Sequence, residues 1–411
     1  MNAKASPILI TEPARPPHPF WSGAFRPLFL LAGILAIVGV VWWVAGMAHG
    51  LPTPTMGSGA WWHGHEMIFG FGGAAIGGFL LTAIANWTGR PPIAGRLLMV
   101  LTATWLIARL AAGFADHLPL VLILIGGLGY FITLMAIAGR ELIQGRNHRN
   151  LVILGLIGLI TLMDGLFIVS TLGAITLDPM VIYQTAILVI VLLIGLIGGR
   201  IIPAFTRNWM QRDGMMHLPM PVMFNKFDGV CLAVLTIAIA LNLFDPTRQI
   251  AGIALLLAGV LHVIRMARWR GIYTWRDPLV AILHLAYLWV PVGLIVLGIA
   301  MLAPDVMAAR DALHGLTGGA MACMILAIGG RAALGHTGRD LRASPALLIA
   351  FGAIWIGTVL RLLVGISTDY YMVILAAATL LWIGGWIAFL IGYAPVLWGP
   401  ARQKSRGIPV R

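Results

Sequence analysis

Twelve apolar stretches run through this chain, each about as long as one bilayer crossing and separated by short polar segments. A membrane-spanning helix needs about 20 predominantly apolar residues. The stretches cover residues 28–49, 63–85, 95–114, 117–139, 150–173, 180–201, 226–244, 249–268, 278–302, 311–333, 344–366 and 370–396. No interval between them is long enough for a soluble domain. The sequence therefore predicts an all-α polytopic membrane protein with one twelve-helix domain.

Composition excludes a soluble fold. The chain is 60% hydrophobic and 10% charged, whereas soluble domains are roughly 25% charged. Its 15 tryptophans suit the aromatic belts of membrane proteins. Cys231 and Cys323 lie in apolar runs and indicate neither a disulfide framework nor a CxxC metal site. No GxxxxGK[ST], HExxH or nucleophile-elbow motif is present. Nothing therefore indicates a nucleotide site or a soluble catalytic module.

The net charge of +13 is explained by membrane topology. All but four of the 27 basic residues fall before the first span, in every second loop or in the tail; the exceptions are Arg109, Arg248, Arg310 and Arg361. The positive-inside rule then places both termini in the cytoplasm. We expect a cytoplasmic N-terminal segment (1–27), a membrane domain (28–396) and a basic cytoplasmic tail (397–411). This charge pattern predicts contact with membrane lipid and no binding of nucleic acid.

Short motifs recur at a spacing of about 125 residues, which equals four spans. The Asn-Trp pairs at residues 86 and 208 lie 122 residues apart, and the Thr-Gly-Arg ends at residues 90 and 339 lie 249 apart. At the other ends of the same spans, His63-Gly64 and His314-Gly315 lie 251 apart. Such periodicity indicates an internal repeat. It predicts that spans two, six and ten occupy equivalent places around a shared interior, in three arcs of four helices.

Three histidines are expected at one level near the non-cytoplasmic face. His63 and His65 open span two, and His314 opens span ten. Counting along the helices places the three imidazoles within roughly 5 Å of one level. Residues two apart on a helix point about 200° away from each other. His63 and His65 should therefore face different neighbours.

The histidines are compatible with three interpretations. Histidines from two helices can clamp a haem within a bundle. Imidazole and thioether groups also suit copper, and His49, Met56, Met67 and His117 are expected on the same side. Alternatively, histidines beside Trp61 and Trp62 belong to the aromatic belt. Spacing alone leaves these interpretations open.

Other ionisable residues fall within predicted spans. Arg109, Asp164 and Arg361 are expected near one depth, past the midplane toward the outer face. Asp164 is expected to pair with an arginine, and Arg109 is a candidate ligand of a haem propionate. His262 and His284 fall in the cytoplasmic half. They are expected either to bond backbone carbonyls or to form a polar cluster or proton path with Tyr287.

Several segments resemble the NnrS family: FRPLF at residues 25–29, WHGHEMIFG at 62–70, GFLLTA at 78–83, NWTGR at 86–90, and Arg331 with GHTGR at 335–339. The resemblance covers nearly the whole chain. It implies a bacterial inner-membrane protein that contains haem and copper and is linked to denitrification and nitric oxide resistance. The twelve spans and their repeat are also similar to the catalytic subunits of haem-copper oxidases and nitric oxide reductases.

This sequence departs from the oxidase pattern at the metal ligands. Those enzymes carry HxH on span ten, whereas here it is on span two and span ten has His314 alone. The span-six segment around Tyr183 and Gln184 lacks their copper-binding histidine. Copper would then have to use His49 with His63 or His65, and Met56.

The resulting prediction is a haem-binding and copper-binding inner-membrane protein of nitric oxide metabolism, with its site near the periplasmic face. A b-type haem is expected between His314 and either His63 or His65, with the other span-two histidine facing copper or an open coordination position. Reduction, binding and sensing of nitric oxide all remain open, and the sequence does not identify an electron donor. The alternative is a metal-free secondary transporter, because transporters also combine internal repeats with charges at membrane depth.

Overall fold

The computed structural model describes residues 18–245, 248–367 and 369–402. Within these residues twelve helical segments are long and apolar enough to cross a membrane, as predicted. They are α1 (Phe25–His49), the α2–η2–α3 unit (Gly59–Thr88), α4 (Arg96–Gly113), α5 (Leu120–Gln144), α6 (Leu151–Thr171), α7 (Pro179–Arg212), α8 (Lys226–Phe244), α9 (Gln249–Ala267), α10 (Pro278–Leu302), the α11–η5–α12 unit (Ala309–His336), α13 (Pro345–Val364) and α14 (Tyr371–Trp398). Three short 3₁₀ turns, η1 (Pro19–Trp21), η3 (His148–Asn150) and η4 (Gly271–Arg276), complete the helical structure. Residues 1–17 and 403–411 of the predicted terminal segments lie outside the described residues, so their expected cytoplasmic placement stays a prediction.

Helix starts follow ordinary capping chemistry. Asp178, Asp277 and Ser344 each accept a hydrogen bond from a backbone N–H in the first turn of α7, α10 and α13, and a proline follows each of them. Hydropathy predicted the span borders to within a few residues, except at the end of α7. There the helix continues beyond residue 201 to Arg212, because its polar last turns remain helical after the apolar run has ended.

Spans two, six and ten form the interior, as the repeat predicted. In their most apolar windows 83%, 72% and 78% of the residues are buried, compared with at most 56% in any other span. The expected equivalence of these three spans is therefore matched by their burial. The arrangement of all twelve spans as three arcs of four remains a prediction.

Spans two and ten share a further feature that the sequence did not reveal. Each begins with a short α-helix, α2 (Gly59–His65) or α11 (Ala309–His314). Each then passes through a π-helical segment, η2 (Glu66–Gly72) or η5 (Gly315–Ala322), before continuing as α3 (Gly73–Thr88) or α12 (Cys323–His336). The π segments begin 249 residues apart, which is the repeat distance of the Thr-Gly-Arg ends. Span six has no such break, since α7 is one continuous α-helix.

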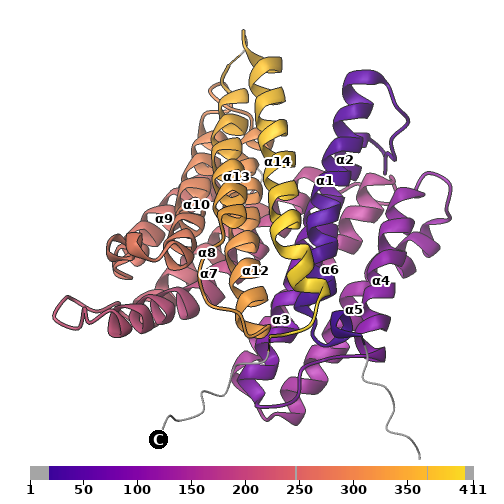
Figure 1. Ribbon diagram of the computed structural model, residues 1–411. Helices are drawn as coiled ribbons and strands as arrows, with labels where there is room; N and C mark the ends of the chain where they lie inside the picture. The colour runs from indigo at the N-terminus through magenta and orange to yellow at the C-terminus, as the bar shows by residue number, and fades with distance from the viewer. Residues whose placement is uncertain (1–17, 246–247, 368, 403–411) are drawn as a thin grey trace, which may run out of the picture.

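The first and last spans are neighbours. α1 packs against α14, and the two lie side by side in Figure 1. The buried guanidinium of Arg26 donates hydrogen bonds to the carbonyls of Leu397 (2.9 Å) and Gly399 (2.6 Å) at the end of α14. The start of α1 and the end of α14 thus share one face of the molecule. We call it the inner face, and the opposite face, where α2 and α11 begin, the outer face.

Candidate functional site

His65 is the centre of a buried network of charged groups near the outer face. Its Nδ1 lies 3.1 Å from Glu66 Oε1, and its Nε2 lies 2.9 Å from Asp164 Oδ1 of α6. Arg109 of α4 donates from Nη1 to the same oxygen of Glu66, at 2.6 Å. His65, Glu66 and Asp164 are almost completely buried. The network therefore joins spans two, three and five at membrane depth.

The charges in this network balance. Ionised carboxylates only accept hydrogen bonds, so a histidine between two of them donates from both ring nitrogens and is an imidazolium. The positive charges of His65 and Arg109 then offset the negative charges of Glu66 and Asp164. Because both ring nitrogens are occupied, this placement leaves no free nitrogen on His65 for a metal. Asp164, which we had expected to pair with an arginine, bonds His65 instead.

His63 faces different neighbours from His65, as helix geometry predicted. Its ring stacks on Trp43 of α1, with the ring centroids 5.7 Å apart and the planes 17° apart. The buried Nδ1 of His63 has no hydrogen-bond partner. His63 also lies near His314 and Arg361, close enough for their charges to act on one another. A half-buried imidazole of span two thus lies within electrostatic range of the equivalent histidine of span ten.

His314 has the hydrogen bonding expected of a metal ligand. Its Nδ1 lies 3.2 Å from the carbonyl oxygen of Asp311. A carbonyl only accepts, so Nδ1 carries the hydrogen and Nε2 keeps its lone pair. Metal-ligating histidines commonly donate their second ring nitrogen in this way, which fixes the tautomer.

Arg361 of α13 lies within electrostatic range of His63 and His314. Its Nη1 and Nη2 both lie 3.1 Å from Asp311 Oδ1. Sequence reasoning noted Arg361 only for its depth. The repeat indicated the position of Arg361 more directly. Adding the repeat distance of 249 residues to position 109 gives position 358, about one helical turn before Arg361.

The π segments start at these histidines. η2 follows His65 directly and η5 follows His314 directly. A π-turn inserts one extra residue into an α-helix, and such insertions are frequent at functional sites. The side chains of the two helix beginnings are thereby rotated relative to the rest of their spans. Spans two and ten thus both carry a π-helical segment directly after a histidine at the outer end of the span. We therefore take the outer ends of these two spans as the candidate site.

Two of the histidines expected on the outer side, His49 and His117, lie at the surface. His49 is exposed at the end of α1, and His117 is exposed in the loop after α4. Met56 is buried in a small apolar cluster with Trp62. Among the described residues, no group of three or more His, Cys, Asp or Glu side chains is close enough to hold a metal ion.

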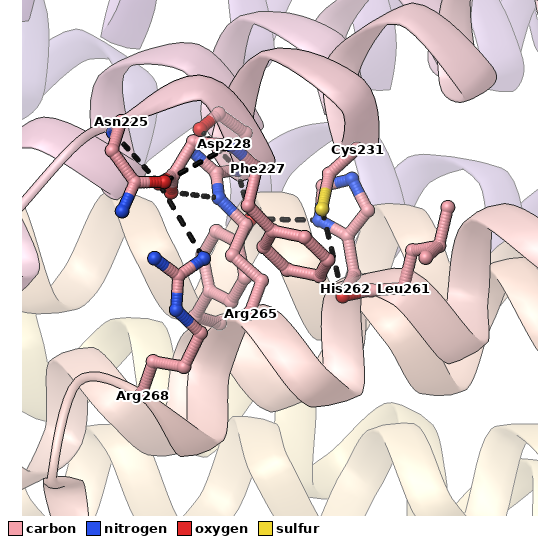
Figure 2. A network of polar contacts seen from close by, with 10 residues as sticks. Asn225, Phe227, Asp228, Cys231, Leu261, His262, Arg265 and Arg268 are labelled. Carbon is pink, nitrogen blue, oxygen red and sulfur yellow. Dashed lines mark hydrogen bonds and ion pairs between the residues drawn. The ribbon is translucent and has the colours of Figure 1, made fainter. Parts of the chain in front are cut away.

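A second polar cluster lies in the inner half of the bundle (Figure 2). Asp228 of α8 accepts a hydrogen bond from Arg265 Nε at 2.7 Å and lies 3.8 Å from Arg268. Arg265 Nη1 donates to the hydroxyl of Tyr287 at 2.8 Å. That hydroxyl lies 2.8 Å from His262 Nδ1. His262 thus bonds the Tyr287 side chain, as the polar-cluster expectation proposed.

His284 is held separately, through Nε2 at 2.8 Å from the hydroxyl of Thr206. Its partner, like that of His262, is a side chain of another span. No contact described here links the inner cluster to the His65 network. The two clusters are therefore treated as separate sites.

Comparison with known proteins identifies one family. A family model described as NnrS protein matches residues 19–401, which is nearly the whole chain. No curated protein matches the sequence.

Proposed function

We propose that this chain, which belongs to the NnrS family, is a haem-binding inner-membrane protein of bacteria that binds nitric oxide near its outer face. The family is associated with haem, copper and nitric oxide. The twelve apolar spans establish a multi-pass membrane protein. The bound group and the location of its site are the proposal.

The observation that carries this proposal is the pairing of His63 with His314. Each belongs to an interior span and lies within electrostatic range of Arg361. The Nδ1 of His63 has no hydrogen-bond partner, and the Nε2 of His314 keeps its lone pair. Two such histidines from different helices would be the residues that hold a b-type haem. His65 does not suit this role, because both of its nitrogens face carboxylates.

A bound haem would supply an iron that takes nitric oxide when one of the two histidines is displaced from it. The protein's own residues set the surroundings. Trp43 limits rotation of the His63 ring by stacking on it, and the Asp311 carbonyl fixes the orientation of His314. Arg361 places a positive charge within electrostatic range of both rings, where it suits a propionate or another anion.

Copper has weaker support. The family association favours it, but the described residues offer no group of three suitable side chains. We therefore assign no step to copper. Metal analysis of the purified protein decides whether it is present.

The test of the function is the absorption spectrum of purified protein in its oxidised, reduced and nitric-oxide-treated forms. We expect a Soret band that shifts when nitric oxide is added to the reduced protein. The absence of a Soret band would reject the proposal. Consumption of nitric oxide by reconstituted protein with an electron donor would then distinguish a reductase from a protein that only binds or senses the gas.

A proton-coupled secondary transporter is the second candidate, and the His65 network favours it. Ionisable groups buried at membrane depth serve as proton relays in transporters, and internal repeats are a transporter feature. If this candidate is right, a proton gradient should drive substrate uptake into proteoliposomes that contain metal-free protein. Uptake that persists after removal of all haem and metal would favour it over the haem proposal.

A further inference from the structure

We propose that an apolar cavity at the centre of the bundle binds a small apolar gas and leads it toward the two histidines. Gas binding in the cavity stands on the cavity's own geometry. Its role in delivering nitric oxide rests on the proposed function.

The cavity lies where the three interior spans meet. It has a volume of about 80 Å³. Its walls come mainly from η2 and α3, from α7, and from η5 and α12, with Phe29 of α1 and Ile153 of α6 closing the sides. Because spans two, six and ten all contribute, the cavity occupies the shared interior that the repeat creates.

The lining contains only glycine, alanine, isoleucine, leucine, phenylalanine and methionine. A buried water needs two to four polar partners, and cavities lined by apolar residues alone stay dry and bind xenon or benzene. The space is therefore suited to an uncharged, apolar molecule. About 80 Å³ is ample for a diatomic gas and far too small for a haem.

A gap between side chains, too narrow to hold a water-sized molecule, continues from this cavity toward the outer face. Its lining includes Ile68, Leu316 and Thr317 together with Ile190 and Met321, and the last two also line the larger cavity. Ile68 follows His65 by three residues, and Leu316 follows His314 by two. The gap thus begins directly below the histidine level. Its one polar side chain, Thr317, already donates its hydroxyl to the Leu313 carbonyl, so it offers no free donor.

Ile190 and Met321 form the junction between the cavity and the gap. Methionine is unbranched and adapts its shape easily, and side-chain rotamers change within nanoseconds where space allows. Met321 also lies against Gly72 of η2, where a Cβ atom would fall 2.9 Å from its sulfur. A glycine at that position therefore keeps room for the methionine at the junction.

The position of the cavity matches the chemistry of the proposed ligand. Nitric oxide is small and nearly apolar, so it partitions into the bilayer and reaches the protein from its lipid-facing sides. At 1.5 Å per residue, Phe79 at the inner end of the lining lies about 16 Å deeper than Ile68. The gap between the cavity and the histidine level is closed in this structure, so a gas would pass only when side chains such as Ile190 and Met321 move.

The test is xenon binding to the purified full-length protein, followed by structure determination under xenon pressure. We expect xenon in the cavity of the wild-type protein. Ile190→Phe should reduce xenon occupancy several-fold, because the larger ring fills the junction. Ile391→Phe is the matched control: Ile391 is 72% exposed on α14 and faces away from the interior. It should bind xenon like the wild type. A wild-type cavity that holds ordered water, or that excludes xenon, overturns the proposal.

Ile325→Phe provides a second variant if Ile190→Phe fails to fold. Ile325 lines the larger cavity but not the gap, so its replacement fills the space from the other end. Unchanged xenon occupancy in a folded Ile325→Phe or Ile190→Phe protein would also contradict the proposal, as would a lipid or detergent chain in the cavity.

Delivery of the gas is tested by nitric oxide rebinding after flash photolysis of haem-loaded protein. We expect Ile190→Phe to slow rebinding from the bulk several-fold with an unchanged Soret band, and Ile391→Phe to leave it unaffected. Equal rates in the three proteins would reject delivery. If the protein holds no haem, the proposed function fails while the xenon experiment still decides whether the cavity binds gas.

Discussion

At the scale of single residues, the pairing of His65 with two carboxylates is the arrangement that the sequence could not predict. The sequence showed that His63, His65 and His314 share one level, because this follows from helix counting. It did not show which side chain each histidine faces, since that depends on how α4 and α6 are rotated about their own axes. Asp164 illustrates this limit: its depth was predicted correctly, but its partner is His65 and not an arginine.

Asp164→Asn should destabilise the protein without removing the haem. The substitution leaves the two positive charges of His65 and Arg109 with one buried carboxylate. Removing one member of a buried ion pair costs about 3–5 kcal/mol, so the midpoint of thermal unfolding in lipid nanodiscs should fall clearly below that of the wild type. Asp305→Asn is the control, because Asp305 is exposed in the loop between α10 and α11 and should change the midpoint little. Equal midpoints for Asp164→Asn and the wild type would show that the network does not stabilise the fold.

At the scale of the elements, the helices were predicted well and their irregularities were not. Apolar length determines where a span lies, so the borders of α8, α9 and α10 agree with the prediction to within about one residue. The π segments η2 and η5 depend on how glycine-rich helices pack against their neighbours. For example, a Cβ atom on Gly70 would fall 2.4 Å from Arg109 Nη1. The hydropathy pattern of the sequence does not predict how closely a side chain of one helix approaches the backbone of another.

The contact between α7 and α9 gives a direct test of close helix packing. A Cβ atom on Gly199 would meet Arg265 Nη2 at 1.8 Å and Cζ at 2.6 Å. Gly199→Ala should therefore displace the Arg265 guanidinium from Asp228 and lower the thermal midpoint, because a buried charge loses its partner.

Gly229→Ala in α8 is the matched control for that substitution. A Cβ atom there meets nothing within 4 Å. Alanine is also favoured over glycine within a helix by about 1 kcal/mol, so this variant should be as stable as the wild type or slightly more stable. A Gly199→Ala protein with an unaltered midpoint would show that Arg265 has room to move.

At the scale of the whole molecule, the internal repeat explains most of the architecture. It predicted that spans two, six and ten are interior, and their burial agrees. It did not predict that span six would lack the π segment of the other two. Arg26 holds the beginning and the end of the bundle together on the inner face. Both ends of the described chain therefore lie on the face that also carries most of the basic residues.

This topology predicts that both termini are cytoplasmic. A green fluorescent protein fused to the C-terminus should fluoresce in cells, because it folds in the cytoplasm, and an alkaline phosphatase fused at the same place should be inactive. A fusion after residue 306, in the loop between α10 and α11 at the outer face, should show the opposite pattern. Phosphatase activity at the C-terminus would reverse the orientation and place the candidate site on the cytoplasmic side.

The central claim is that His63 and His314 hold a haem and that His65 does not. It is tested most directly by the haem content and Soret spectrum of three variants, His63→Ala, His314→Ala and His65→Gln, purified in parallel with the wild type. We predict that the first two lose the haem or shift its spectrum, whereas His65→Gln keeps the wild-type band. A His314→Ala protein that retains an unaltered haem spectrum, or a wild-type protein without a Soret band, would contradict the claim.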